Sequence, residues 1–230
     1  MAPQLSIIIP VLNEAGCISQ SLSALQILRT AGHEVVVVDG GSEDATVSLS
    51  RPLSDQVIRA LRGRSRQMNV GARAASGEIF LFLHVDTCLP QNGDRLVIDG
   101  LKRYSRHWGR FDVRLSGTHP LLRIVERLMN WRSRLTGIAT GDQGIFVKRK
   151  LFEAVGGFPD IDLMEDVALS RILKRLGPPL CLRERVLTSS RRWDKNGILR
   201  TVFLMWRLRI YYALGSSPKR LAHRYGNLKS

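Results

Sequence analysis

Over residues 1–90 the pattern of apolar and polar positions predicts strands and helices in regular alternation. Continuous apolar runs, rich in isoleucine and valine, predict buried strands at residues 5–10, 34–39, 56–58 and 79–83. Apolar residues spaced three and four positions apart predict a helix over residues 14–31. An acidic cap opens a second expected helix at residues 44–49, and Ser76-Gly77 ends a third over residues 64–75. Such an alternation of strand and helix is typical of a doubly wound, mainly parallel α/β sheet that is flanked by helices.

The pattern over residues 91–230 is less regular. Strands are expected at residues 111–115, 144–147 and 180–187. Helices are expected at residues 94–106, 120–135, 150–155, 166–176 and 198–214. No internal repeat, low-complexity stretch or linker interrupts the chain, so we expect residues 1–230 to form a single domain with a functional division near residue 90.

The charge is strongly basic and unevenly spread. The chain has 35 lysines and arginines against 20 acids, a net charge of +15. Residues 1–50 hold one basic side chain and five acids, whereas residues 183–230 hold twelve basic side chains and two acids. This gradient indicates either an anionic partner near the C-terminal part, such as phosphates, nucleic acid or a membrane surface, or a solvated basic face.

The cysteines and the lengths of the apolar runs indicate the cellular compartment in which the protein is expected. Cys17, Cys88 and Cys181 lie far apart and match neither a zinc site nor a disulfide framework, which favours a reducing environment. The first residues lack the basic stretch and long apolar core of a signal peptide. No run of about 18 apolar residues predicts a membrane span, so we expect a cytoplasmic protein.

Clusters that contain polar residues stand at the ends of three of the predicted strands. They comprise Pro10, Asn13 and Glu14 at the end of the first strand, Asp39, Gly40 and Ser42 at the end of the second, and His84 and Asp86 at the end of the fourth. In an open parallel sheet, ligands bind beyond the carboxyl ends of the strands, where a carboxylate can accept hydrogen bonds from ribose hydroxyls or from a base. The alternative is that Asn13 and Ser42 simply cap helices. Neither a dinucleotide fingerprint nor a P-loop occurs.

Four segments together carry a resemblance to a known family. SIIIPVLNEAGCI, EVVVVDGGSEDAT, GRSRQMNVGARAASGEIFLFLHVDT and the later MED resemble the family 2 glycosyltransferases of the GT-A fold, in consistent order over residues 5–195. The chain is most similar to a bacterial subgroup of small enzymes whose metal motif reads H-x-D. The resemblance implies transfer of a sugar from a nucleotide-diphosphate sugar, first of all a UDP-sugar, to an unknown hydroxyl acceptor, with inversion of the anomeric centre.

The resemblance also implies a donor site. Pro10, Asn13 and Glu14 would line the ribose and base, Asp39 would bind the base edge within the loop of Gly40 and Ser42, and Arg64 and Asn69 would lie near the diphosphate. The alternative for Arg64 and Asn69 is an exposed helix face. Under the resemblance, residues 1–90 form the nucleotide-sugar half, residues 91–195 the acceptor half, and residues 196–230 a basic amphipathic extension.

The family's metal motif is altered in this chain. Members usually carry D-x-D, and Asp86 matches the last aspartate, which ligates a divalent cation, Mn²⁺ or Mg²⁺, that also binds the diphosphate. His84 replaces the first aspartate. Imidazole suits Mn²⁺ better than Mg²⁺, and packing is the alternative role for His84.

The later motifs imply the catalytic and acceptor residues. Asp166 matches the family's general base, and Glu165 would position the acceptor or the base, although both acids could instead stabilise a helix N-terminus. On the acceptor side the resemblance places Gly141, Asp142, Gln143, Arg192 and Trp193. A surface tryptophan against basic side chains is the alternative for Trp193.

Two other functions remain open from the sequence. A polyprenyl-phosphate sugar transferase would share the donor site but would take its acceptor at a membrane surface, where the helices over residues 120–135 and 198–214, rich in arginine and aromatic residues, would suit the headgroup region. The protein would then be peripheral on the inner face of the membrane. A basic nucleic-acid-binding protein is less favoured, because no RNP, helix-turn-helix or zinc pattern occurs.

Overall fold

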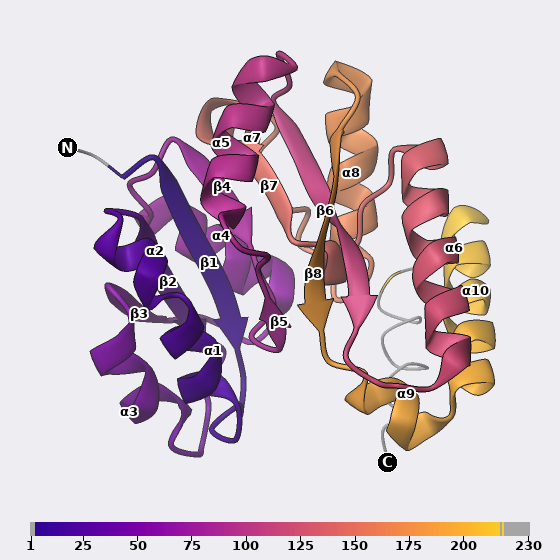
Figure 1. Cartoon of the computed structure of the whole chain (residues 1–230), viewed down its shortest axis with the longest axis horizontal. Helices are drawn as coiled ribbons and strands as arrows, with labels where there is room; N and C mark the ends of the chain where they lie inside the picture. Colours follow the sequence, from indigo (N-terminus) through magenta and orange to yellow (C-terminus); the bar gives the residue numbers. More distant parts are fainter. Residues whose placement is uncertain (1–2, 217, 219–230) are drawn as a thin grey trace.

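The computed structural model describes residues 3–216 and 218, and the strands in this part of the chain form one curved sheet (Figure 1). They are β1 (Leu5–Val11), β2 (Glu34–Asp39), β3 (Gln56–Arg59), β4 (Ile79–Phe82), β5 (Thr87–Cys88), β6 (Trp108–Leu115), β7 (Ile145–Lys148) and β8 (Leu180–Thr188). Their order across the sheet is β3-β2-β1-β4-β7-β6-β8-β5. β1, β2, β3 and β4 are parallel, as predicted.

Helices cover both faces of this sheet (Figure 1). They are α1 (Ile18–Ala24), α2 (Gln26–Thr30), α3 (Thr46–Ser50), α4 (Arg64–Ala74), α5 (Gly93–Arg103), α6 (Pro120–Thr136), α7 (Arg149–Ala154), α8 (Glu165–Leu176), α9 (Arg191–Asn196) and α10 (Ile198–Ala213), with short 3₁₀ turns η1 (Arg51–Leu53) and η2 (Gly141–Gln143). None of the helices within the described residues is both long enough and apolar enough to span a bilayer.

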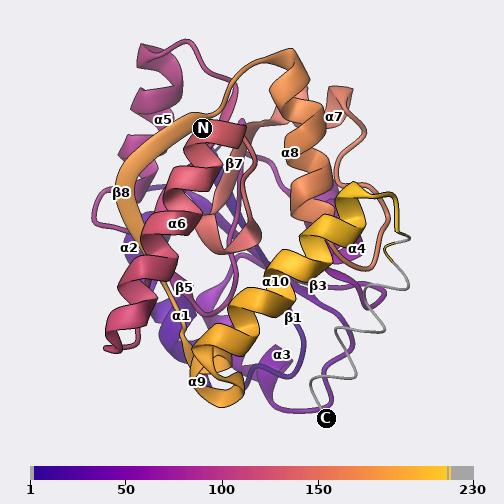
Figure 2. The same cartoon turned by 90° about the vertical axis from the view of Figure 1, so that its right-hand side faces the viewer.

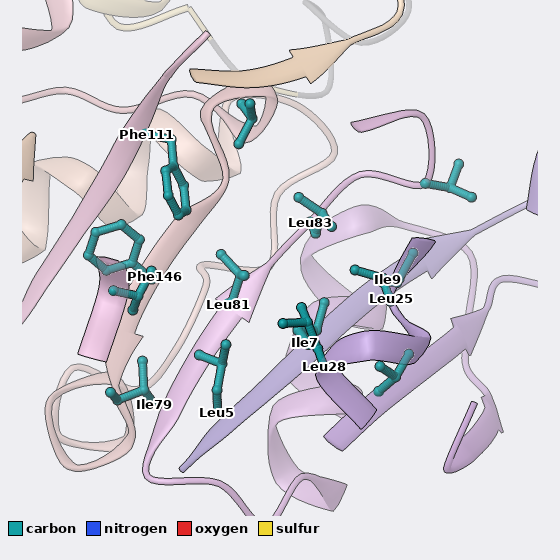
Figure 3. Close-up of a cluster of buried hydrophobic side chains, with 14 of the residues drawn as sticks. Leu5, Ile7, Ile9, Leu25, Leu28, Ile79, Leu81, Leu83, Phe111 and Phe146 are labelled. Carbon is teal, nitrogen blue, oxygen red and sulfur yellow. The ribbon is translucent and has the colours of Figure 1, made fainter. Parts of the chain in front are cut away.

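Alternate residues of β1, β2 and β4 build two separate cores, because successive strand side chains point to opposite faces. Ile7 and Ile9 pack with helices α1, α2 and α5 on one face (Figure 3). Ile8, on the other face, packs with α4, α7 and α8. Gly71 of α4 is required by this packing, since a Cβ there would lie 2.5 Å from Cγ2 of Ile8 and 2.8 Å from Cγ2 of Val38.

The direction of β7 brings a distant loop to the functional edge of the sheet. β7 is antiparallel to β4, and Phe82 pairs with Ile145. The residues that precede β7, including η2, therefore emerge beside the residues that follow β4. β6 and β8 run parallel to each other and antiparallel to β7, with a register shift between Phe111 and Asp112. Their carboxyl ends thus point to the same edge as those of β1 and β4.

The predicted elements agree with the structure except in details. The helix expected over residues 14–31 is two helices, because the chain leaves helical hydrogen bonding at Leu25 between α1 and α2. β6 begins three residues before the predicted start at residue 111. The two-residue strand β5 and the short helix α9 were not predicted. α6 and α10 lie side by side at one end of the sheet (Figures 1 and 2).

Candidate active site

A cavity of about 1100 Å³ opens at the carboxyl-terminal edge of the sheet. Its floor comes from the segments after β1 and β4, and its opposite wall comes from α6 and α10. Eight residues predicted for the site line it: Pro10, Glu14, Arg64, His84, Asp86, Asp142, Glu165 and Trp193. The sequence therefore identified residues from six separate segments that the fold brings into one cleft.

The other predicted residues do not line this cleft. They are Asn13, Asp39, Gly40, Ser42, Asn69, Gly141, Gln143 and Asp166. The side chain of Arg192 lies outside the described part of the structure, although its backbone belongs to α9. Most of these residues hold the loops around the cleft, as their hydrogen bonds show.

The loops after β1 and β2 are fastened to each other. The carboxylate of Asp39 is fully buried and accepts hydrogen bonds from the backbone amides of Gly41 at 3.1 Å and Ser42 at 3.0 Å. The amide of Asn13 donates to Oγ of Ser42 at 2.9 Å, and Oδ1 of Asn13 accepts from the amide of Glu43. Asn13 has a φ of 54°, a left-handed conformation that asparagine tolerates. The loops after β1 and β2 are thus preorganised by their own hydrogen bonds.

Gln67 supports these loops and was missed by the sequence analysis. Its Nε2 donates to the carbonyl oxygens of Val11 at 2.9 Å and Val38 at 2.8 Å, which ties the ends of β1 and β2 to α4. A Cβ at Gly40 would lie 3.1 Å from this side-chain amide, which explains the glycine. The available signal was position: Gln67 stands four residues before Gly71, on the buried face of the helix.

Asn69 has a structural role that differs from the predicted contact with a diphosphate. Its Nδ2 donates to the carbonyl of Phe158 at 2.8 Å, and its Oδ1 accepts from the amide of Phe158 at 2.9 Å. A Cβ at Gly157 would lie 2.6 Å from Oδ1 of Asn69, so the glycine permits this approach. Asn69 therefore fastens the loop that precedes α8 to helix α4 through two hydrogen bonds.

One arginine connects two carboxylates on the floor of the cleft. Nη2 of Arg191 lies 3.9 Å from Oε2 of Glu14 and 3.8 Å from Oδ2 of Asp86. The carboxylates from the ends of β1 and β4 therefore point to the same place. Arg191 directly precedes Arg192 and Trp193, the two residues that the resemblance places on the acceptor side. Trp193 lines the cleft and also packs against a small core that includes Leu115 and Val125.

His84 makes a second contact, between the floor of the cleft and the loop of residues 141–143. Its Nδ1 lies 3.3 Å from Oδ1 of Asp142, and its ring packs against Gly141, where a Cβ would come within 2.5 Å of Nε2. Gln143 is fully buried beneath this loop, and its Oε1 accepts from the amide of Thr140. The segment of residues 141–143 thus positions Asp142 against the end of β4.

The residues present fit an open metal site better than a closed one. Within the described residues, no group of three or more His, Cys, Asp or Glu side chains is arranged to hold a metal ion. Asp86 and Glu14 nevertheless direct two carboxylates to one point. Mg²⁺ is commonly bound by one or two carboxylates together with substrate phosphates, so this donor set suits a cation whose remaining ligands come from a bound diphosphate.

The predicted catalytic pair occupies the start of α8 and divides into two environments. Met164, the residue before the helix, has a φ of 68°, a strained conformation for this side chain. Glu165 lines the cleft but is only 7% exposed. Burial, and next the negative charge of Asp166, raise the pKa of Glu165 to about 7, against the opposite influence of Arg64 and His84. Glu165 can therefore exchange a proton near neutral pH.

Asp166 uses its carboxylate to hold the neighbouring loop. Its Oδ2 accepts from the amide of Gly141 at 2.9 Å, and its Oδ1 accepts from the amide of Val167 at 2.7 Å. Two arginines of the opposite wall, Arg132 and Arg209, lie close enough to interact with its charge. Burial lowers the pKa of both arginines, that of Arg132 to about 10. The negative charge of Asp166 thus lies near two arginines of the helical wall.

Comparisons with known proteins agree with this architecture. A sequence model described as glycosyl transferase family 2 matches residues 6–155. Glycosyltransferase AglE of Haloferax volcanii is 36% identical over 97 residues, which are 38% of this chain and 32% of AglE. An uncharacterized glycosyltransferase of Haemophilus influenzae is 31% identical over 163 residues, which are 66% of this chain and 55% of that protein. The chain thus spans between a third and somewhat over half of these relatives.

Two solved structures share the fold. Mannosyltransferase PcManGT from Pyrobaculum calidifontis, in complex with GDP-Man and Mn²⁺, superposes with a TM-score of 0.64 at 24% identity, covering 99% of this chain and 70% of that protein. S. aureus TarS 1–349 in complex with UDP superposes with a TM-score of 0.65 at 18% identity, covering 81% of this chain and 60% of that one. At such identities the likeness establishes the fold alone, a mainly parallel α/β sheet of the GT-A type.

Proposed function

The chain belongs to glycosyl transferase family 2, and from this premise we propose that it transfers a sugar from a nucleotide-diphosphate sugar to a hydroxyl acceptor, with inversion at the anomeric carbon. A UDP-sugar is the first candidate for the donor. The observation that carries the proposal is the meeting, in one cleft, of the carboxylates of Glu14 and Asp86 with Glu165 from the start of α8. Two solved structures of this fold are complexes with UDP and with GDP-Man, which supports a nucleotide-sugar donor.

The donor would lie along the ends of β1, β2 and β4. Pro10 and Glu14 line the cleft there, and the buried carboxylate of Asp39 fixes the loop that would receive the base. Arg64, at the N-terminus of α4, lines the same cleft and would contact the diphosphate together with the helix dipole. Gly40 and Ser42 would provide backbone groups for the nucleoside.

Asp86, with Glu14 or His84 beside it, would hold a divalent cation. The solved structure of PcManGT is a complex with GDP-Man and Mn²⁺, which supports this assignment. When bound, such a cation supplies positive charge that offsets the negative charge of the departing diphosphate. Arg191 holds the two carboxylates in place in this structure and would meet the diphosphate as a second cation.

The acceptor hydroxyl must lose its proton while its oxygen attacks the anomeric carbon and the bond to the diphosphate breaks. Asp166 is the proposed base, and Glu165 would position the acceptor. The cleft-lining position of Glu165 and its pKa near 7 also make it a suitable proton acceptor. Asp142 and Trp193 also line the cleft and would contact the acceptor sugar or hydroxyl.

Thermal stabilisation by nucleotides tests the proposal. UDP or GDP with Mn²⁺, at hundredfold excess over its Kd, should stabilise the native protein by about 2.7 kcal/mol and raise Tm by several degrees. Asp39→Ala should abolish this shift, whereas Asp99→Ala, at an exposed position on α5, should retain it. A nucleotide shift of equal size in Asp39→Ala and in the unaltered protein would show that the donor binds elsewhere.

A further inference from the structure

Helix α10 exposes one continuous apolar stripe. Leu199, Phe203, Trp206 and Ile210 are 61%, 73%, 63% and 53% exposed, and Leu214, directly after the helix, is 77% exposed. Their spacing of four, three, four and four residues places them on a single face of the helix. A helix that covers a core buries such a stripe, so this one lacks its apolar partner within the described residues.

Helix α6 exposes a matching stripe. Ile124, Leu128, Trp131 and Leu135 are 52%, 50%, 62% and 65% exposed, again at a spacing of four, three and four residues. Of the fifteen large apolar side chains that are exposed within the described residues, nine belong to these two stripes. A concentration of this kind on one face marks an interaction surface, because single apolar side chains are normally scattered.

The two stripes lie next to each other and flank the mouth of the cleft. α6 and α10 lie on the same side of the molecule in both views (Figures 1 and 2). Leu128, Trp131 and Leu135 of α6 line the cleft from one side, and Trp206 of α10 lines it from the other. The apolar face therefore continues inward to the candidate active site.

Arginines border this apolar face. Helices α6 and α10 hold seven arginines and one acid, Glu126, which is buried and paired with Arg123. At 100° per residue, the exposed Arg200 and Arg207 lie along one edge of the α10 stripe, and the exposed Arg127 lies along an edge of the α6 stripe. Apolar side chains bordered by arginines are the arrangement of helices that lie in the headgroup region of a membrane.

Inside the cleft the same two helices contribute Arg132 and Arg209, which approach each other closely enough to interact despite their like charge. Nε and Nη2 of Arg132 are buried and have no hydrogen-bond partner among the described residues. Unsatisfied guanidinium donors favour an anionic group at this position. The part of the cleft lined by Leu128, Trp131, Leu135 and Trp206 is an apolar groove between the two helices. It contains, at Arg132 and Arg209, a site that suits a phosphate or a carboxylate.

We propose that the face formed by α6 and α10 docks on an anionic lipid bilayer, so that the groove between the two helices opens towards the membrane. The positive charge of this face favours an anionic bilayer over two other partners, a second copy of the chain and residues 219–230. A two-fold dimer through this face would place the same arginines of both copies against each other. Residues 219–230 carry Lys219, Arg220, Arg224 and Lys229 and no acid, so they would be repelled as well. Anionic headgroups complement both the arginines and the apolar stripes.

The docking surface also restricts the acceptor, and this part rests on the proposed function. An acceptor that reaches the cleft from the bilayer has a hydrocarbon chain, which would lie against Trp131 and Trp206, and an anionic group near Arg132 and Arg209. The acceptor class is therefore an amphiphilic lipid with a hydroxyl or phosphate group at its head.

Vesicle sedimentation tests the docking directly. The full chain should bind vesicles of phosphatidylcholine mixed with phosphatidylglycerol more strongly than vesicles of phosphatidylcholine alone. Phe203→Ser with Ile210→Ser should weaken this binding at least about tenfold, because each removes a side chain from the apolar face. The matched control, Ile27→Ser with Leu176→Ser, alters two other exposed apolar residues, 74% and 60% exposed, and should bind like the unaltered protein.

Arg200→Gln with Arg207→Gln should reduce the preference for phosphatidylglycerol, by roughly fivefold for each arginine that lies near the membrane surface.

The chain should sediment as a monomer without lipid, and deletion of residues 219–230 should leave a substantial part of the vesicle binding. The proposal is overturned by absence of vesicle binding, by unchanged binding of the Phe203→Ser, Ile210→Ser variant, or by complete loss on deleting residues 219–230. A dimer that this same variant dissociates would assign the face to a second copy and would overturn it too.

The docking and the proposed function can fail independently. Vesicle binding requires no nucleotide, and the nucleotide-induced rise in Tm requires no lipid. The Phe203→Ser, Ile210→Ser variant should keep the nucleotide-induced rise, since neither residue lines the cleft. Vesicle binding without a nucleotide response would contradict the glycosyltransferase proposal and leave the docking surface in place.

Discussion

The backbone amide of Gly141 donates a hydrogen bond of 2.9 Å to Oδ2 of Asp166. The loop before β7 and the start of α8 are therefore held together at the cleft, although 25 residues separate them in the chain. Asp142, the next residue of the loop, lies 3.3 Å from His84. These contacts connect the end of β4 to Asp166, the proposed base. A substitution of Asp166 can therefore lower activity either by removing the base or by displacing the loop.

Asp166→Asn separates these two roles. The amide keeps one oxygen that can accept from Gly141, loses the acceptor for the amide of Val167 and cannot take a proton, so we expect sugar transfer to fall by about 10²–10⁴-fold while donor affinity stays nearly unchanged. A purely structural role predicts instead a loss of about 1 kcal/mol of stability with activity largely kept. Transfer rate, donor affinity and Tm should be measured on the same preparation.

Glu165→Gln is the companion to this variant. If Asp166→Asn retains turnover while Glu165→Gln is inactive, the base is Glu165, which lines the cleft directly. Activity in both variants would contradict the proposed displacement mechanism.

The raised pKa of Glu165 predicts how stability depends on pH. The folded protein holds this proton up to about pH 7, whereas the unfolded chain releases it near the ordinary value of 4.5. The folded state therefore binds more protons between these values, and the contribution of Glu165 to stability is lost as pH rises through this window, by about 3 kcal/mol at most. Glu165→Gln cannot ionise, so its Tm relative to the unaltered protein should increase from pH 5 to pH 8. A constant difference across this range would contradict the raised pKa.

Asn69 provides a test of a structural against a ligand-binding role. Asn69→Ala removes both hydrogen bonds to Phe158 and should lower stability by about 1–3 kcal/mol, with nucleotide affinity unchanged. Asn69→Asp should be destabilising as well, because one carboxylate oxygen can still accept from the amide of Phe158 but the other would face the carbonyl oxygen of Phe158 without a proton to donate. Unchanged Tm with a large loss of nucleotide affinity in Asn69→Ala would restore the predicted contact with the diphosphate.

Arg191→Gln should have opposite effects on two ligands. Removal of the guanidinium frees the carboxylates of Glu14 and Asp86, so Mn²⁺ alone should bind somewhat more tightly, by up to about fivefold for so exposed an arginine. The nucleotide diphosphate should bind more weakly, because a charge-assisted hydrogen bond is lost. Calorimetry with each ligand separately distinguishes the two. Equal loss of both affinities would indicate a collapsed loop.

Asp86→Asn should weaken the Mn²⁺-dependent part of nucleotide binding, since a neutral amide is a poorer ligand for a divalent cation. His84→Asp recreates the D-x-D pattern and should shift the preference towards Mg²⁺, because imidazole is replaced by a hard oxygen ligand. Identical metal dependence in both variants and in the unaltered protein would exclude Asp86 from a metal site.

The sequence by itself determined the elements and the edge of the sheet that carries the site. The apolar run at residues 34–39 and the spacing of apolar residues in the helices are local patterns. Burial of these apolar side chains stabilises the strand or helix wherever it lies in the fold. The rule that ligands bind beyond the carboxyl ends of parallel strands then located Glu14 and Asp86 without coordinates. The resemblance to the family's motifs identified Glu165, which lines the same cleft.

Only the tertiary structure decided which of these side chains face the cleft. Asn69 turns to Phe158, 89 residues away, and Asp166 turns to Gly141, because backbone amides exposed by distant loops offer better partners than solvent. The reversed direction of β7 and the pairing of α6 with α10 depend on contacts between segments far apart in sequence. A stripe of apolar residues predicts an amphipathic helix but not its partner, so the exposure of Phe203 and Trp131 became evident only from the assembled fold.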